Sequence, residues 1–363
     1  MKNRFFLLMI LLPVFLSGQT LREEYLAARD AGDFLREKQL EKELLAVLGA
    51  ETDPLIRTSL KRALFIERIP VEEGGFFDGS ISALAAAGDD IWAGSRSGDL
   101  GRYSLSERKW QMMSVGAPSL AVRAVNSILP GSGRIWILSY GSLAWYDLRT
   151  GELNQASLPD HPDYRGMQSG VLLGDGLLAG TQGGGLRRIR ADGGAVLEMP
   201  RFIRNVSYIA RIGPERILLG TEENGLFFLD SLRESRPVTE NNRQTSAVRT
   251  ILGTGDSFLG GSYGQGLFSL KRDEEGHYEY RRLSAAGKWI TDGVRLKGGY
   301  CFSTLGSGLI YLSAPDTAPG QFGIPEGLPS LDITALAYSE PYIICGTQGQ
   351  GLIKIHENYF LTP

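Results

Sequence analysis

The stretch IICGTQGQGLIKI, residues 343–355, decides the fold of this chain. Apolar residues lead into Gly346 and Thr347, a glycine-rich turn follows, and a second apolar alternation starts at Leu352. Side chains of a strand point alternately to its two faces, so alternation on both sides of a short glycine turn predicts a β-hairpin. We expect glycine on both flanks of the turn because the chain there needs positive φ, which glycine adopts without a steric penalty.

The same pattern of apolar strand, glycine-rich turn and second strand recurs along the chain with a nearly constant period. The leucine after each turn lies at Leu100, Leu143, Leu186, Leu226, Leu267, Leu309 and Leu352, with spacings of 43, 43, 40, 41, 42 and 43 residues. A period of about 40 to 50 residues that holds only short strand patterns indicates a β-propeller, with one four-stranded sheet per repeat. The sequence therefore predicts an all-β fold, a seven-bladed β-propeller with a short N-terminal α-helical segment.

The propeller is expected to occupy residues 65–363, with its ring closed by both ends of the domain. The stretch FIERIPVEEGGFFDGSISALA, which begins at Phe65, resembles GQFGIPEGLPSLDITALA, which leads into the seventh repeat. Residues Phe65 to Val71 are therefore expected to form the outer strand of the last blade. The alternative is that the third predicted helix continues to Ile66, because Leu60 and Leu64 fit helical spacing.

Residues 1–18, MKNRFFLLMILLPVFLSG, have the pattern of a secretory signal peptide. Lys2 and Arg4 precede an apolar run of 12 residues, which is short of the roughly 20 that a membrane-spanning helix needs. The alternative is an uncleaved anchor. No cysteine follows the run, so the chain is not expected to be a lipoprotein, and no transmembrane segment is expected in the mature chain. The predicted location is periplasmic or secreted.

Residues 19–64 are rich in Leu, Ala, Glu, Lys and Arg and predict two or three helices. Asp33 is expected to cap one helix, and Asp53 followed by Pro54 is expected to begin the next, because aspartate accepts hydrogen bonds from the free amides of a first turn. About 45 residues cannot bury a core of their own, so these helices are expected to pack on the propeller; pairing with another chain is the alternative.

The repeat resembles the two-component regulator propeller repeat family, whose copies carry Trp or Ile, Gly-Thr, a glycine turn, and then Leu with an aromatic residue. All seven copies match to some degree, and Trp92 and Trp136 supply the frequent tryptophan. The resemblance covers the ring alone. Propellers of that family form periplasmic sensor regions that recognise carbohydrates, so the resemblance implies a similar binding role here. It does not imply signalling by phosphotransfer, because the sequence shows no kinase region.

Charge and composition exclude several classes of function. Basic residues number 38 and acidic residues 41, a net charge of -3, so no nucleic acid is expected as a partner. Two cysteines and three histidines leave little material for a metal centre, and we expect no metal, no cofactor and no catalytic residues. Glu222 and Glu223 lie in a blade turn and are expected to diverge into water. Cys301 and Cys345 are expected to be buried free thiols.

The sequence favours a non-enzymatic binding propeller whose ligand is a carbohydrate or an envelope protein. The alternatives are a structural scaffold of an envelope complex and a polysaccharide-acting enzyme, which a buried carboxylate or a tyrosine-arginine pair at the mouth would favour. Aromatic and arginine side chains stack on sugars and dominate protein interfaces. The candidate ligand-binding residues, which lie in loops before the innermost strands or in nearby turns, are Arg165, Arg204, Arg243, Trp289, Tyr140 and Tyr263. The alternative is that Trp289 and Phe202 plug the ring.

Overall fold

The computed structural model describes most of the chain. The described residues are 20–69, 71, 79–113, 123–131, 133–156, 158, 166–174, 176–190, 196–198, 203–213, 216–230, 234–238, 247–254, 256–275, 277–283 and 288–361. The predicted leader, 1–18, lies outside them. Within these residues, no helix combines the length and the apolar character needed to cross a membrane.

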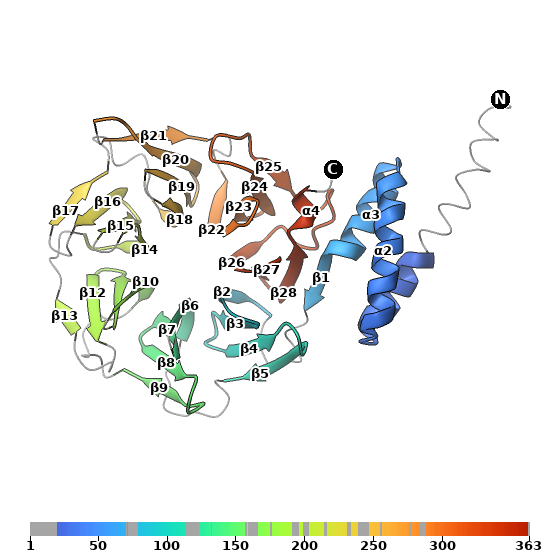
Figure 1. Cartoon of the computed structure of the whole chain (residues 1–363). Helices are drawn as coiled ribbons and strands as arrows, with labels where there is room; N and C mark the ends of the chain where they lie inside the picture. Colours follow the sequence, from blue (N-terminus) through green and yellow to red (C-terminus); the bar gives the residue numbers. More distant parts are fainter. Residues whose placement is uncertain are drawn as a thin grey trace.

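The strands form seven four-stranded antiparallel sheets, arranged as blades around a central axis (Figure 1). Blades one to three contain β2 (Ile81–Ala87), β3 (Asp90–Ser95), β4 (Leu100–Ser104) and β5 (Lys109–Met112); β6 (Arg123–Gly131), β7 (Arg134–Tyr140), β8 (Leu143–Asp147) and β9 (Leu153–Gln155); and β10 (Met167–Leu173), β11 (Gly176–Thr181), β12 (Gly185–Arg190) and β13 (Val196–Glu198). Blades four to six contain β14 (Val206–Arg211), β15 (Arg216–Thr221), β16 (Leu226–Asp230) and β17 (Glu234–Pro237); β18 (Val248–Thr254), β19 (Ser257–Ser262), β20 (Gly266–Arg272) and β21 (Tyr278–Arg282); and β22 (Trp289–Leu296), β23 (Gly299–Leu305), β24 (Leu309–Leu312) and β25 (Gly320–Phe322). The predicted seven-bladed propeller is therefore confirmed.

Blade seven closes the ring with strands from both ends of the propeller. It contains β26 (Ile333–Ser339), β27 (Tyr342–Thr347), β28 (Leu352–His356) and, on its outer edge, β1 (Ile66–Ile69). Strand β1 runs antiparallel to β28, with Ile66 opposite Ile355 and Ile69 opposite Leu352. The expected outer strand is present, and the preceding helix ends one residue before it, at Phe65.

Glycine at the end of the second strand allows neighbouring blades to pack closely. A Cβ atom placed on Gly94 would lie 2.5 Å from Cγ1 of Val125 in the next blade, and one on Gly346 would lie 2.7 Å from Cγ2 of Ile81. The expectation of positive φ holds for Gly351, at the far side of its turn, where φ is 72°. It is wrong for Gly346, which is absent from the positive-φ positions and is required by the contact between blades.

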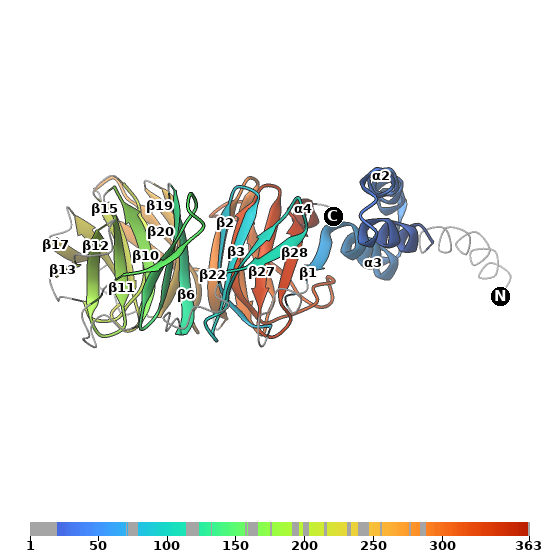
Figure 2. The same cartoon turned by 90° about the horizontal axis from the view of Figure 1, so that it is seen from below.

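The helical segment packs against the outer edge of blade seven (Figures 1 and 2). It consists of a helix over 20–30, α2 (Phe34–Ala50) and α3 (Pro54–Phe65), and a short helix α4 (Asn358–Leu361) follows the last strand. The Asp33 carboxylate accepts a hydrogen bond from the Arg36 amide, 3.1 Å away. The Asp53 carboxylate accepts one from the Leu55 amide at 2.8 Å. Both predicted caps are confirmed.

Apolar contacts join the helices to the ring. Leu44 of α2 and Leu60 of α3 share one core with Ile353 of β28 and Tyr359 of α4. This contact confirms that the helices dock on the propeller. The buried free thiols of Cys301 and Cys345 belong to the same core, and burial raises the pKa of both.

Candidate functional site

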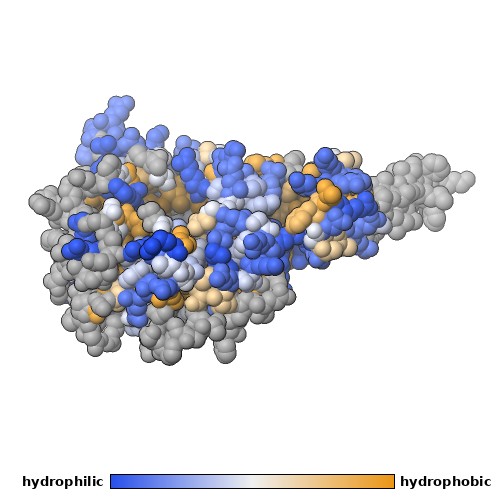
Figure 3. Space-filling model, turned by 60° about the horizontal axis from the view of Figure 1, so that its bottom comes forward, coloured by the Kyte–Doolittle hydropathy of each residue, from blue (hydrophilic) through white to orange (hydrophobic). Residues whose placement is uncertain are grey.

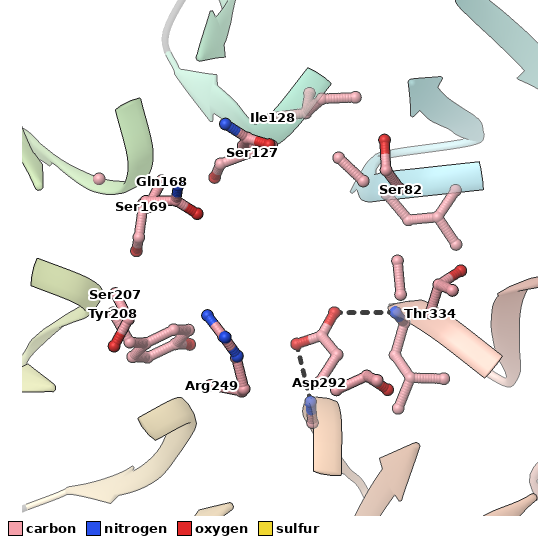
Figure 4. Close-up of a pocket in the computed structure, with 18 of the residues that line it drawn as sticks. Ser82, Ser127, Ile128, Gln168, Ser169, Ser207, Tyr208, Arg249, Asp292 and Thr334 are labelled. Atoms are coloured by element: carbon pink, nitrogen blue, oxygen red, sulfur yellow. Dashed lines mark hydrogen bonds between the residues drawn. The ribbon is translucent and has the colours of Figure 1, made fainter. Parts of the chain in front are cut away.

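The innermost strands of the seven blades surround a cavity of about 330 Å³, which we call the central cavity. Figure 4 shows the Gln168, Tyr208, Arg249 and Asp292 side chains directed toward the hollow centre of the ring. Hydroxyl, amide, guanidinium and carboxylate groups form most of this lining. The polar residues that line it are Ser82, Asn126, Ser127, Gln168, Ser169, Ser207, Tyr208, Arg249, Thr291, Asp292 and Thr334.

Each innermost strand carries an irregularity at the same place, directly after a buried apolar residue near its start. The pairing with the second strand skips one residue there, for example between Ile81 and Ala83. A skipped residue of this kind turns its side chain away from the regular alternation of the strand. The residues skipped at this equivalent place in blades one to seven are all polar: Ser82, Asn126, Gln168, Ser207, Arg249, Thr291 and Thr334. Blade two has a second irregularity, which skips Ala124.

Five of these seven side chains form hydrogen bonds between blades. The donor reaches the backbone carbonyl of the buried apolar residue near the start of the innermost strand of the next blade. The pairs are Ser82 to Val125 at 2.6 Å, Asn126 to Met167 at 2.7 Å, Ser207 to Val248 at 2.6 Å, Thr291 to Ile333 at 2.6 Å, and Thr334 to Ile81. The bond from Thr334 joins the last blade to the first.

Gln168 and Arg249 are the two exceptions, and both have longer side chains. Gln168 makes no side-chain hydrogen bond within the described residues, and it points into the central cavity (Figure 4). Arg249 donates two hydrogen bonds to the Glu222 carboxylate, at 2.7 and 3.3 Å. Gln168 is therefore not used to join blades, whereas Arg249 joins blade five to the preceding blade through Glu222 and not through a backbone carbonyl of the next blade. Glu222 does not diverge into water as expected, because Arg249 holds it, whereas Glu223 is exposed.

Arg249 also connects the central cavity to an aromatic pair on the rim. Its guanidinium lies 5.5 Å from the centroid of the Tyr263 ring. Tyr263 stacks on Trp289, with ring centroids 5.0 Å apart and planes 24° from parallel. Exposed fractions are 37% for Tyr263 and 50% for Trp289, so Trp289 does not plug the ring. Phe202 lies outside the residues that the structure describes. We call Tyr263 and Trp289 the aromatic pair.

The other predicted ligand-binding residues do not join this pair within the described part of the chain. Tyr140 is 44% exposed at the end of β7, on the other side of the ring. Arg204 is exposed in the loop before β14, on the same face as the blade turns, because its carbonyl accepts a hydrogen bond from the Gly185 amide. Arg165 and Arg243 lie outside the described residues, so the arginine part of the predicted site remains a prediction.

Asp292 is the carboxylate that lines the central cavity. Its Oδ1 accepts a hydrogen bond from the Gly293 amide at 2.7 Å, and its Oδ2 accepts one from the Leu336 amide of blade seven at 2.8 Å. Burial raises the pKa of this carboxyl to about 6, and the two backbone donors offset only part of that effect. None of the described basic groups forms an ion pair with it.

Sequence reasoning did not single out Gln168, Arg249 or Asp292. A signal was present, because each lies one or two residues after a buried apolar residue at or near the start of an innermost strand, namely Met167, Val248 or Ile290. Aligning the seven repeats at that residue gives Ser, Asn, Gln, Ser, Arg, Thr and Thr in the next position. Gln168 and Arg249 are the two residues in this column that are too long to act like the others.

The described part of the chain contains no cluster of side chains that could form a metal site. No group of three or more His, Cys, Asp or Glu side chains there is arranged to hold a metal ion. His277 is exposed in a hairpin, and His356 ends β28, where burial lowers its pKa. His161 lies outside the described residues.

Comparison with known proteins shows similarity in structure but not in sequence. No protein-family model and no curated protein matches the chain. A streptogramin B lyase structure is similar to it with a TM-score of 0.63 and 13% identity, covering 80% of this chain and 97% of the lyase. The extracellular domain of BT3049 from B. thetaiotaomicron, described as a hybrid two-component system, has a TM-score of 0.62 and 16% identity over 80% of this chain and 41% of that one.

A third similar structure points the same way. The extracellular domain of BT4673 from B. thetaiotaomicron, described as a one-component system, has a TM-score of 0.62 and 17% identity, over 80% of this chain and 40% of that one. At such identities these likenesses show the fold. They place the chain in the class of β-propellers.

Proposed function

We propose that this protein is a non-enzymatic binding propeller that holds a carbohydrate at the mouth of its ring. The single observation that carries the proposal is the aromatic pair, exposed beside the polar central cavity and linked to it by Arg249. An aromatic face packs against the C–H face of a sugar ring, while hydroxyl and amide groups bond to its hydroxyls. Both kinds of group are present within one side of the mouth.

The predicted arginines extend this proposal around the rim. Arg204 is exposed on the same face as the blade turns, and we propose that it, Arg165 and Arg243 contact acidic groups of the ligand. A guanidinium holds a carboxylate in a bidentate pair, which a neutral sugar does not offer. Arg204→Ala is therefore expected to weaken binding of an acidic glycan more than binding of a neutral one.

The experiment is a glycan array followed by calorimetric titration of the best ligand. Trp289→Ala is expected to weaken binding at least tenfold, about 1.4 kcal/mol, because it removes the exposed stacking face. Tyr140→Ala is the control, since Tyr140 is an exposed aromatic residue at the end of the second strand of blade two, on the other side of the ring. Equal losses in the two variants, or no loss in Trp289→Ala, would contradict the proposed site.

An enzymatic alternative has one observation in its favour, the half-buried carboxylate of Asp292 in the central cavity. Hydrolysis of a glycosidic bond by the usual route needs two carboxyl groups placed on either side of it. Asp292 is the only acidic residue among the described residues that line the central cavity, and both of its oxygens accept backbone hydrogen bonds. This arrangement favours binding over hydrolysis.

The scaffold alternative would use the helical segment as a contact for a partner. Its buried face is already occupied by blade seven, although Leu35 and Leu55 remain 86% and 83% exposed. Figure 3 shows apolar surface at this end of the molecule. Affinity purification from an envelope extract compares the two functions: recovery of a protein partner that Trp289→Ala does not release would favour scaffolding.

Export is the second part of the proposed function. We propose that the leader is removed near Gly18 and that the mature chain acts in the periplasm or outside the cell. Mass spectrometry of the N-terminus from native material tests this. An intact Met1 in the membrane fraction would contradict it.

A further inference from the structure

We propose that the central cavity binds a protonated primary amine, with the Asp292 carboxylate as its counter-ion. This site lies inside the ring, apart from the aromatic pair on the rim. It rests on the charges that line the cavity. It stands whether or not the rim binds a carbohydrate.

The charge balance of the described residues around the cavity leaves one carboxylate without a cation. Arg249 is the basic residue of the lining, and its charge is matched by Glu222 in a two-bonded pair. Tyr208 faces Asp292 from blade four and is neutral, because burial raises its pKa to about 12. A buried charge without a partner is unfavourable, so a cationic ligand would gain energy by supplying that partner.

The geometry of Asp292 leaves acceptor capacity directed at the cavity. Each carboxylate oxygen has about two lone-pair sites, and each accepts one backbone amide, from Gly293 or Leu336. Figure 4 shows the carboxylate between the Arg249 side chain and the blade-seven strand, at the edge of the open centre. One lone pair on each oxygen thus remains for a ligand.

An ammonium group fits this lining better than a metal ion does. A single carboxylate among hydroxyls and amides offers too little negative charge for a calcium site, which usually draws on several carboxylates. An ammonium has three donors and needs only one anion with neutral acceptors around it. Gln168 of blade three adds a neutral polar side chain to the same cavity, and no described residue engages it.

The cavity size limits what the amine can be attached to. A volume of about 330 Å³ holds a short chain or one small ring. The amine can therefore belong to a free small molecule or to a lysine side chain presented by a protein. These two sources share the same recognition chemistry, and the experiment separates them.

The test measures binding of two amine probes to the full chain by ligand-observed NMR. The probes are n-butylamine, and a lysine amide whose α-amino group is acetylated. Butan-1-ol is the uncharged control. We expect both amines to bind at pH 7.5, and butan-1-ol to bind at least tenfold more weakly. Tighter binding of the lysine amide assigns the site to a protein partner, and tighter binding of n-butylamine assigns it to a small molecule.

Two variants and one change of pH locate the counter-ion. Asp292→Asn is expected to weaken the binding of n-butylamine at least tenfold. Asp316→Asn, at an exposed loop position, is expected to leave that binding unchanged. Lowering the pH from 7.5 to 5.0 is expected to weaken binding about tenfold, because the pKa of Asp292 is about 6 without ligand. The pH comparison uses the native chain, so it remains decisive if Asp292→Asn does not fold.

The proposal fails if butan-1-ol binds as well as n-butylamine at pH 7.5, or if folded Asp292→Asn keeps the wild-type affinity. Trp289→Ala separates this site from the rim: it is expected to lose glycan binding and to keep n-butylamine binding. If the native chain binds n-butylamine but no glycan, the result contradicts the proposed function and leaves the proposed amine site intact.

Discussion

The Ser82 hydroxyl of blade one donates a hydrogen bond to the Val125 carbonyl oxygen of blade two, 2.6 Å away. The equivalent contact recurs at four other junctions of the ring, and the last of them, from Thr334 to Ile81, joins the two ends of the propeller. A side chain that is skipped in one sheet thus binds the next sheet. At the two junctions without the contact, Gln168 makes no side-chain hydrogen bond within the described residues, and Arg249 binds Glu222 of the preceding blade.

Ser207→Ala is expected to destabilise the protein by about 1 to 3 kcal/mol, because it removes the donor to the Val248 carbonyl in a buried junction. Gln168→Ala is the matched control at the equivalent position of blade three, and it is expected to change stability by less than about 0.5 kcal/mol. Urea unfolding followed by circular dichroism measures both. A similar cost for the two variants would show that Gln168 is also structural.

The sequence predicts the blades well because their period depends on short-range patterns. Each hairpin pattern, with its glycine turn and the leucine that follows the turn, is visible when the seven repeats are aligned with one another. The capping aspartates Asp33 and Asp53 are equally local, since each bonds to an amide within three residues. The outer strand Ile66–Ile69 was predictable only as one of two alternatives, because its partner β28 lies almost 300 residues away.

The candidate site is less predictable because it combines residues from different blades. Trp289 and Tyr263 were both selected for their residue types, but nothing local shows that they stack. Arg249 was missed, since its role depends on Glu222 of the preceding blade. Asp292 was missed because its bond to Leu336 depends on how blade six packs against blade seven.

Gly94→Ala is expected to destabilise the protein by about 1 to 3 kcal/mol, since the new methyl would overlap the Val125 side chain of the next blade. The control is Gly49→Ala in α2, where a Cβ meets no atom within 4 Å. This control should stabilise the chain by about 0.5 to 1 kcal/mol, because alanine favours a helix. Thermal unfolding of both variants tests whether the repeated glycine serves packing; a neutral Gly94→Ala would contradict it.

Arg108→Ala is expected to loosen the contact between the helical segment and blade one. The Arg108 guanidinium donates to the Arg29 carbonyl at 3.0 Å and to both oxygens of Glu37 at 3.3 Å. Charged hydrogen bonds of this kind contribute about 1 to 3 kcal/mol. Limited proteolysis within 20–65 should therefore accelerate in the variant, and it should not in Arg272→Ala, which alters an exposed pair with Asp256. If Arg108→Ala and the wild type were cleaved at equal rates, the apolar core alone would hold the helical segment on the propeller.

The stability of the ligand-free protein is expected to depend on pH through Asp292. Its pKa in the folded chain is about 6, above the ordinary value of 3.8, so the folded state binds more protons than the unfolded state between these two values. The Asp292 contribution to the free energy of unfolding therefore falls as pH rises from about 4 to about 6, and levels off above it.

Asp292→Asn removes this titration while keeping an amide of similar shape. The difference in unfolding free energy between wild type and variant is expected to shift against the wild type by about 2 to 3 kcal/mol between pH 4 and pH 7.5. Denaturant unfolding at a series of pH values measures it, and Asp316→Asn serves as the exposed control. A difference that stays constant over this range would mean that the Asp292 carboxylate is already compensated, and the cavity would then have no charge to offer a ligand.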